Sequence, residues 1–203
     1  MKLVHFGLTN PDLKKFSINE RKGKRFISYG FDDLLAVSEV KLKGQHNLSN
    51  ALAALALCRA LELPVSPLVA ALREFRGLPH RMEKIAAYNG VTFYDDSKST
   101  NVGATIAALT GMGQKVVLIA GGEGKDQDFS VLRPAVDDCA RAVVLIGRDA
   151  QKIGDALQGS TVPVFYAESM EEAIQRGFLL AQTGDVVLLS PACASFDLFK
   201  NYE

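Results

Sequence analysis

Four segments of the sequence place lysine, hydroxyl, acidic or glycine residues directly after short apolar runs. The pairs are Val91–Tyr94 before Asp95–Asn101, Val116–Ala120 before Gly121–Asp126, Ala142–Ile146 before Gly147–Asp149, and Val186–Leu189 before Ser190–Ser195. Lysine ammonium groups and serine or threonine hydroxyls suit anionic ligands such as phosphates and carboxylates. Glycine lets backbone N–H groups approach an anion closely. Together the segments predict a site for an anionic small molecule.

Each signal has a plainer explanation when it is taken alone. Gly121 and Gly122 would serve as an ordinary turn between a strand and a helix, and Lys98 and Lys125 as solvated surface lysines. Asp96 would serve as a helix cap. The repetition favours a binding site, because ligands of open α/β sheets bind beyond the carboxyl ends of the strands.

The elements that would position these segments follow from the order of apolar runs. After about residue 80, strand-like runs, which also include Val162–Phe165, alternate with helical ones. The clearest helix is expected over Met170–Ala181, opening with a capping box formed by Ser169 and Glu172. Alternating strands and helices predict an α/β fold with a doubly wound, mostly parallel sheet.

The first 45 residues differ, because they are polar and rich in turns, which predicts short antiparallel strands or a hairpin edge. A helix is expected over Leu48–Leu61, apolar nearly all the way round and therefore buried. A second helix is expected to open with Ser66 as its N-cap and Pro67 after it, and to run to Phe75. The turn-rich stretch Arg76–His80 predicts a linker. We therefore expect two domains, residues 1–77 and 78–203.

Composition excludes several classes of protein. The 203 residues carry 23 basic and 23 acidic side chains, a balance that argues against a nucleic-acid partner. The longest clean apolar run, Ala51–Cys58, is far short of the ~20 residues that span a bilayer, and the N-terminus does not read as a signal peptide. We expect a cytoplasmic monomer without membrane contact. The three cysteines form no C-x-x-C pair and the histidines have no metal-ligand spacing, so we expect reduced thiols and no resident metal.

Five ordered segments resemble the Mur ligase family over about residues 40–203. They are Gly44–Ala51 (G-x-H-N-x-x-N-A), Leu78–Glu83 (L-x-H-R-x-E), Asp96–Asn101 (D-S-K-x-T-N), Gly121–Lys125 and Ser190–Asp197 (opening S-P-A-x-A-S). The third and fifth are most similar to the D-glutamate-adding members. Other Mur ligases and folylpolyglutamate synthases share the His-Asn and His-Arg elements but differ at these two loops.

The resemblance implies an ATP-dependent, ADP-forming, amide-bond-forming ligase of peptidoglycan synthesis. ATP would phosphorylate the carboxylate of UDP-N-acetylmuramoyl-L-alanine, and the amine of D-glutamate would attack the acyl phosphate. It also implies a C-terminal Rossmann-like domain, preceded by the tail of an α/β central ATPase domain. The family's P-loop and most of its Mg²⁺ ligands have no counterpart in these residues, because Gly124-Lys125 is followed by Asp126 instead of Ser or Thr. We therefore expect part of a longer enzyme, inactive by itself.

The resemblance also assigns roles to single residues. Asn47 and Asn50 would lie near the adenine, Arg81 at the ATP phosphates, Asp96 at the ribose, and Lys98, Thr100, Lys125, Ser195 and Tyr202 at the D-glutamate carboxylates, with Lys98, Arg81 and Lys125 catalytic. Tyr202 and Asp95 depart from the family's usual Phe and Asn. Three alternatives stay open: a non-catalytic module that binds nucleotide or D-glutamate, another Mur ligase or folylpolyglutamate synthase-like amide ligase, and a generic small-molecule-binding α/β domain.

Overall fold

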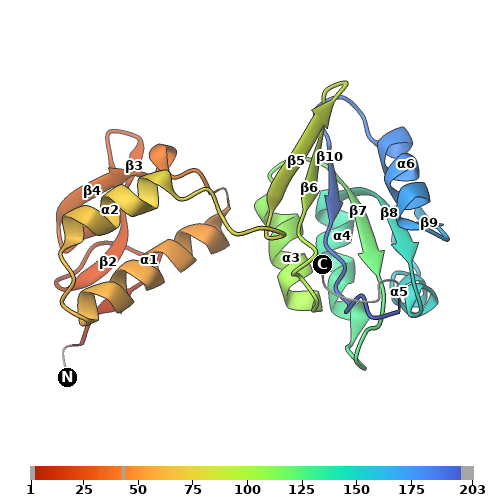
Figure 1. Ribbon diagram of the computed structural model, residues 1–203, viewed down its shortest axis with the longest axis horizontal. Helices are drawn as coiled ribbons and strands as arrows, with labels where there is room; N and C mark the ends of the chain where they lie inside the picture. The colour runs from red at the N-terminus through yellow and green to blue at the C-terminus, as the bar shows by residue number, and fades with distance from the viewer. Residues whose placement is uncertain (1–2, 43, 198–203) are drawn as a thin grey trace. The chain divides into compact units, whose positions relative to one another are not determined.

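The computed structural model describes residues 3–42 and 44–197. The chain divides after Gly77 into two compact units, Met1–Gly77 and Leu78–Glu203 (Figure 1). No helix within the described ranges is both long enough and apolar enough to cross a membrane.

The first unit is a four-stranded sheet with two helices. Its elements are β1 (His5–Phe6), β2 (Lys15–Arg21), β3 (Lys24–Tyr29), β4 (Asp32–Ala36), the 3₁₀ helix η1 (Val37–Glu39), α1 (Gln45–Ala60) and α2 (Val65–Glu74). The strands lie in chain order; β1 pairs parallel to β2, and the others pair antiparallel, as the polar N-terminal segment predicts. Lys22 and Gly23 both have positive φ, the backbone of a tight hairpin turn between β2 and β3.

The two helices of the first unit differ in detail from the sequence prediction. Helix α1 starts at Gln45 instead of Leu48 and is not buried all round, since Leu57 is 70% exposed. Leu48, Leu52 and Leu55 face the core instead, where they join apolar side chains of β2, β3 and β4. Helix α2 starts at Val65, so Ser66 and Pro67 lie in its first turn instead of capping it. Proline is tolerated there because the first N–H groups of a helix have no acceptor within it.

The second unit confirms the doubly wound α/β fold. Its strands are β5 (Glu83–Tyr88), β6 (Val91–Asp95), β7 (Val116–Gly121), β8 (Ala140–Ile146), β9 (Val164–Tyr166) and β10 (Val186–Leu189); its helices are α3 (Val102–Gly111), η2 (Phe129–Leu132), α4 (Arg133–Cys139), α5 (Ala150–Ala156) and α6 (Met170–Leu180). The six-stranded sheet has the order β5-β6-β10-β7-β8-β9. Every neighbouring pair is parallel except β5 with β6.

Both faces of this sheet are covered. Along β7, Val116 and Leu118 pack into a cluster with residues of α3, α4 and α5, whereas Val117 and Ile119 pack into a cluster with Ala173 of α6. From β6 the chain runs in one direction across the sheet, through β7 and β8 to β9, and then returns to place β10 between β6 and β7. Because the crossovers are right-handed, the reversal of direction places α6 on the face opposite to α3–α5. Burial on both faces explains the continuous apolar runs of β7, of β8 after Arg141, and of β10.

Three local predictions in the second unit need correction. The antiparallel edge strand β5 was not expected, because its exposed residues show no alternation; its turn, Asn89-Gly90, has positive φ at both residues, a hairpin signal. The strand expected from Val162 starts at Val164. Helix α6 does open with Ser169 accepting from the N–H of Glu172, but the Glu172 carboxylate accepts from Glu168 instead of returning to Ser169.

Candidate functional site

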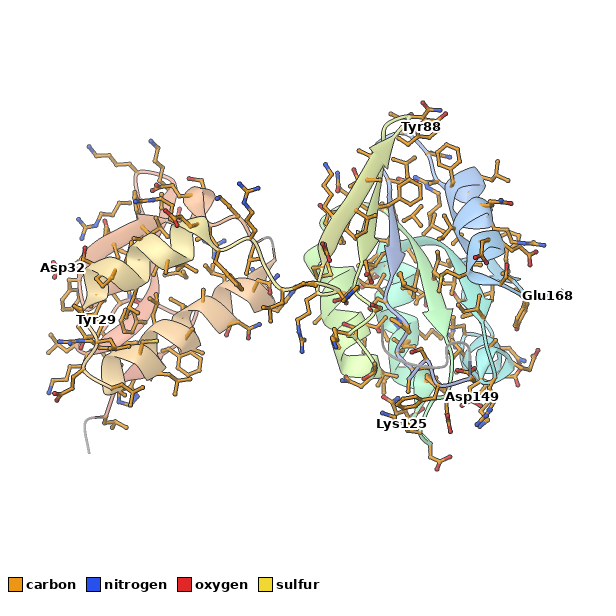
Figure 2. All side chains as sticks on the ribbon, viewed as in Figure 1. Tyr29, Asp32, Tyr88, Lys125, Asp149 and Glu168 are labelled. Atoms are coloured by element: carbon orange, nitrogen blue, oxygen red, sulfur yellow. The ribbon has the colours of Figure 1, made fainter. Side chains whose placement is uncertain are left out.

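The four polar loops predicted from the sequence follow neighbouring strands. Strands β6, β10, β7 and β8 are consecutive and parallel, so the loops after them lie at one edge of the sheet. Figure 2 shows Lys125 and Asp149 at this edge and Tyr88 at the opposite edge. The four loops therefore meet at one edge, as the sequence predicts, and the hydrogen bonds between them define the geometry of this edge.

Asp96 ties the loop after β6 to its neighbours. It is only 4% exposed. Its Oδ2 accepts hydrogen bonds from the hydroxyls of Ser99 at 2.5 Å and Ser190 at 3.1 Å, and its Oδ1 accepts from the N–H of Met82 at 3.1 Å. It is not a helix cap, since Asn101 caps α3 by accepting from Ala104 at 2.9 Å. The Asp96 carboxylate is thus a buried joint between three segments.

His80 lies near the start of the second unit and has a left-handed backbone conformation, with φ 62°. Its Nδ1 lies 2.7 Å from Oδ2 of Asp95, its N–H donates to Glu83, and its carbonyl accepts from the N–H of Lys98. Burial raises the pKa of Asp95, but hydrogen bonds from His80 and Ser97 outweigh it, so this pKa lies below its usual value. His80, Glu83 and Asp95 are the kinds of residue that can hold a metal ion. Their hydrogen bonds to one another explain their proximity without a metal.

The glycine-rich loop after β7 packs tightly against the other loops. Gly121 donates to the carbonyl of Pro191 at 2.9 Å, and Glu123 and Ala194 form a bridge. A Cβ on Gly121 would overlap the carbonyl oxygen of Ile146, and one on Gly122 would overlap that of Ala194. Their φ values of 127° and 123° also require glycine. Loop packing therefore explains these two glycines without any ligand.

Two hydrogen bonds of Gly124 fix the backbone immediately before Lys125. The N–H of Gly124 donates to Oδ2 of Asp149 at 2.7 Å, and the carbonyl of Gly124 accepts from the side chain of Gln127 at 2.8 Å. Lys125 and Asp126 then both adopt left-handed φ values, 51° and 55°. Strained backbone of this kind collects at functional sites. The Lys125 side chain is exposed.

The loop after β8 contributes charged side chains and further contacts with the neighbouring loops. The hydrogen bonds from Lys152 and from Gly124 lower the pKa of Asp149 below its usual value. The Arg148 N–H donates to Asp197 at 2.7 Å, and its guanidinium lies 3.1 Å from the Glu123 carboxylate. These contacts join the loops after β7, β8 and β10. The sequence placed this loop at the edge but did not single out Asp149.

The loop after β10 is buried at its start and exposed at its end. Ser190, Ala192 and Cys193 are fully buried, whereas Ser195 is exposed. Burial, with the charges of Asp149 and Asp197, raises the pKa of Cys193 to about 12. This thiol is therefore protonated at neutral pH and plays no nucleophilic part.

Apart from the buried Asp96 described above, the predicted site residues fall into three groups. Lys98, Thr100, Lys125 and Ser195 belong to loops that the structure joins directly, and all four are exposed or half-buried. Arg81 is exposed at the start of the same unit; Asn47, half-buried, and Asn50, exposed, lie on α1 of the first unit. Tyr202 lies outside the described residues. Their roles toward ligands stay predictions.

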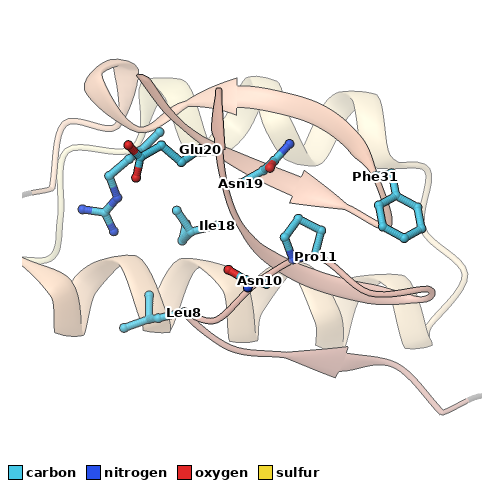
Figure 3. A pocket seen from close by; sticks show the side chains of 8 residues that line it. Leu8, Asn10, Pro11, Ile18, Asn19, Glu20 and Phe31 are labelled. Carbon is cyan, nitrogen blue, oxygen red and sulfur yellow. The ribbon is translucent and has the colours of Figure 1, made fainter. Parts of the chain in front are cut away.

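The first unit also has a pocket of about 520 Å³, shown in Figure 3. Its lining is Leu8, Asn10, Pro11, Ile18, Asn19, Glu20, Arg25 and Phe31. None of these is among the predicted nucleotide or substrate residues.

Comparison with known proteins identifies the relatives of this chain. Residues 80–193 match the family described as Mur ligase, glutamate ligase domain. The chain is 56% identical over 200 residues to the UDP-N-acetylmuramoylalanine–D-glutamate ligase of Nitrosospira multiformis, covering 98% of this chain and 42% of that protein. It is 56% identical over 202 residues to the ligase of the same name from Nitrosomonas europaea, covering 99% of this chain and 43% of that protein.

Solved structures agree at the level of fold. The UDP-N-acetylmuramate-alanine ligase of Thermotoga maritima superposes with a TM-score of 0.69 at 20% identity, over 93% of this chain and 44% of that chain. The chain thus spans less than half the length of the relatives it matches. The match over residues 80–193, together with the identity along nearly the whole chain, shows that the chain belongs to the Mur ligase family.

Proposed function

We propose that this chain is part of an ATP-dependent, ADP-forming ligase that joins D-glutamate to UDP-N-acetylmuramoyl-L-alanine. The observation that carries the proposal is the convergence of Asp96–Asn101, Gly121–Lys125 and Ser190–Ser195 at one sheet edge. Relatives at 56% identity are named for D-glutamate ligation. The reaction would take place in the cytoplasm, with small-molecule substrates and a monomeric enzyme.

The side chains at this edge suit an amino acid with two carboxylates. The ammonium groups of Lys98 and Lys125 and the hydroxyls of Thr100 and Ser195 can donate charge-assisted hydrogen bonds to carboxylate oxygens. Tyr202 would complete this set. Held in this way, the amino group of D-glutamate would be presented to the activated carboxyl carbon, and fixing that orientation lowers the barrier of a two-substrate step.

The resemblance to the family assigns four residues to the nucleotide. We assign Asn47 and Asn50 to the adenine, Asp96 to the ribose and Arg81 to the phosphates, where a planar guanidinium can form paired hydrogen bonds. Both oxygens of Asp96 already accept hydrogen bonds within the protein, so the ribose contact would use a remaining lone pair of this carboxylate. Mg²⁺ would offset charge on the transferred phosphoryl group, with its ligands mainly outside these 203 residues.

The proposal is tested with a polypeptide of the relatives' length that contains this chain. Phosphate release from ATP should require both UDP-N-acetylmuramoyl-L-alanine and D-glutamate. Lys125→Met and Ser195→Ala should raise the KM for D-glutamate, whereas Lys115→Met, before the opposite end of β7, should not. Equal use of another amino acid, such as meso-diaminopimelate, would show that a different acceptor belongs to this site.

The alternative of a silent binding module applies to the 203 residues alone. Its motivation is the missing P-loop, without which the β- and γ-phosphates lose their cradle. The isolated chain should release no phosphate from ATP, and titration calorimetry should detect at most weak binding of D-glutamate or nucleotide. Turnover by the purified chain, free of host enzyme, would refute this.

A further inference from the structure

Gln127 makes hydrogen bonds to three loops with one side chain. Its Nε2 donates to the carbonyl of Gly124 at 2.8 Å and to the carbonyl of Ala192 at 2.9 Å. Its Oε1 accepts from the N–H of Val102 at 3.0 Å. Both amide hydrogens and the carbonyl oxygen are therefore used, and each partner is a backbone atom whose position defines a loop.

Each of these partners lies close to a residue proposed to bind the amino-acid substrate. Gly124 immediately precedes Lys125, Val102 comes two residues after Thr100, and Ala192 comes three residues before Ser195. Val102 lies 25 positions before Gln127 in the sequence, and Ala192 lies 65 positions after it. Gly124 belongs to the same loop as Gln127. Gln127 thus joins, through three bonds, the loops that carry three of the proposed ligands.

The partners of Gln127 have restricted alternatives. Val102 is the first residue of α3, so its N–H has no acceptor within the helix. Ala192 is fully buried with φ 59°, and its N–H already donates to the carbonyl of Ser99. Ala192, in the loop after β10, therefore contacts two other loops. Its N–H bonds to Ser99 in the loop after β6, and its carbonyl bonds to Gln127 in the loop after β7. Without Gln127 the bond to the Ala192 carbonyl is lost, while the Glu123–Ala194 bridge and the bond from Gly121 to Pro191 still join the loops after β7 and β10.

We infer that Gln127 is a positioning residue for the acceptor amino acid, holding Lys125, Thr100 and Ser195 at the separation that two carboxylates require. This rests on the proposed function, since the substrate contacts are those assigned above. Gln127 touches no substrate itself. Its effect is transmitted through Gly124, Val102 and Ala192.

The test compares three variants in a polypeptide of the relatives' length. Gln127→Met keeps the length of the side chain without its hydrogen bonds, and Gln127→Glu keeps an acceptor for the N–H of Val102 only. Gln151→Ala is the matched control, because the Gln151 side chain bonds only to Asp155 within its own helix. Thermal unfolding of each variant shows that the fold is retained.

Gln127→Met should raise the KM for D-glutamate about 10-fold or more while the KM for ATP and kcat change by less than about 3-fold, the signature of lost binding that is equal in the ground state and the transition state. Gln151→Ala should leave all three constants unchanged. Hydrogen exchange should accelerate at Val102 in Gln127→Met but not in Gln127→Glu. Both variants should loosen residues 190–194.

Two results overturn the inference: loosened loops with an unchanged KM for the amino acid, or loops that stay protected in Gln127→Met. A wild-type protein that uses a different acceptor would instead refute the proposed function. The same comparison, run with that acceptor, still decides the role of Gln127.

Discussion

The Asp149 carboxylate accepts a hydrogen bond from the backbone N–H of Gly124 at 2.7 Å, which ties the loop after β8 to the backbone that carries Lys125. Gly124 is buried, so its N–H has no water to replace this partner. The other oxygen of Asp149 pairs with Lys152 at 2.8 Å, and that lysine is exposed. The two interactions of one carboxylate should therefore differ in their effect on stability.

Asp149→Ala should lower the free energy of unfolding by about 1–3 kcal/mol, because it leaves a buried donor unsatisfied. Lys152→Ala, which removes only the exposed partner, should lower it by less than Asp149→Ala does. Urea unfolding of both variants measures the difference. Equal losses would mean that the bond to Gly124 contributes nothing beyond the ion pair.

Acid should destabilise the second unit through Asp149 and Asp185. The hydrogen bond from Arg141 lowers the pKa of Asp185 below its usual 3.8, and Lys152 and Gly124 lower that of Asp149. The unfolded chain then binds protons more readily than the folded one. The resulting stabilisation is complete above the usual pKa and is lost as the pH falls through the lowered values, so the free energy of unfolding should decrease from about pH 5 downward.

Chemical unfolding at a series of pH values checks this dependence. Asp185→Asn should flatten the acid limb, because the titrating carboxylate is removed. Asp138→Asn, an exposed acid at the end of α4, is the control and should leave the slope unchanged. An acid limb of the same slope in Asp185→Asn would contradict the assignment.

Gly121→Ala should destabilise the protein by more than the ~3 kcal/mol that bounds most single substitutions. Its new Cβ would overlap the carbonyl oxygen of Ile146 in the neighbouring strand, and φ there is 127°. Gly113→Ala is the matched control, since Gly113 also has a positive φ but has nothing within 4 Å of the new Cβ. Thermal unfolding compares the two. A similar cost at both positions would show that φ alone, and not the close approach of β8, requires glycine.

Cys193 should resist alkylation in the folded protein. With its pKa raised to about 12 by burial and by Asp149 and Asp197, only about one thiol in 10⁴ is ionised at pH 8, and the thiolate is the reactive form. Iodoacetamide followed by peptide mass spectrometry should show modification of Cys58 and Cys139, which are half-buried, well before Cys193. Denaturant should remove the difference, and rapid native labelling of Cys193 would contradict its burial.

The fold was largely predictable because its strongest sequence signals are local. Strands buried on two faces are short apolar runs, and the polar loops that follow these runs lie at one edge of the sheet. The edge strand β5 escaped prediction because its residues face solvent and neither alternate nor cluster. Helix α1 was expected to be buried all round because composition does not reveal that Leu57 points away from the core.

The connections between the site loops could not be predicted, because they depend on pairing between residues distant in sequence. Asp96 was singled out, but its bond to Ser190 spans 94 positions. Gln127 and Asp149 were passed over, since a glutamine or an aspartate in a polar loop has no distinctive pattern. Their importance comes from backbone groups of other loops, which a sequence does not display.

Strand order gives the second unit a distinctive assembly. β10 is the last of its strands along the chain, yet it lies between β6 and β7. During synthesis, β6 and β7 emerge first and have no shared partner until residues 186–189 leave the ribosome. Pairings so distant along the chain slow folding. The sheet edge that carries the four polar loops includes the loop after β10, so it would be the last part of this unit to form.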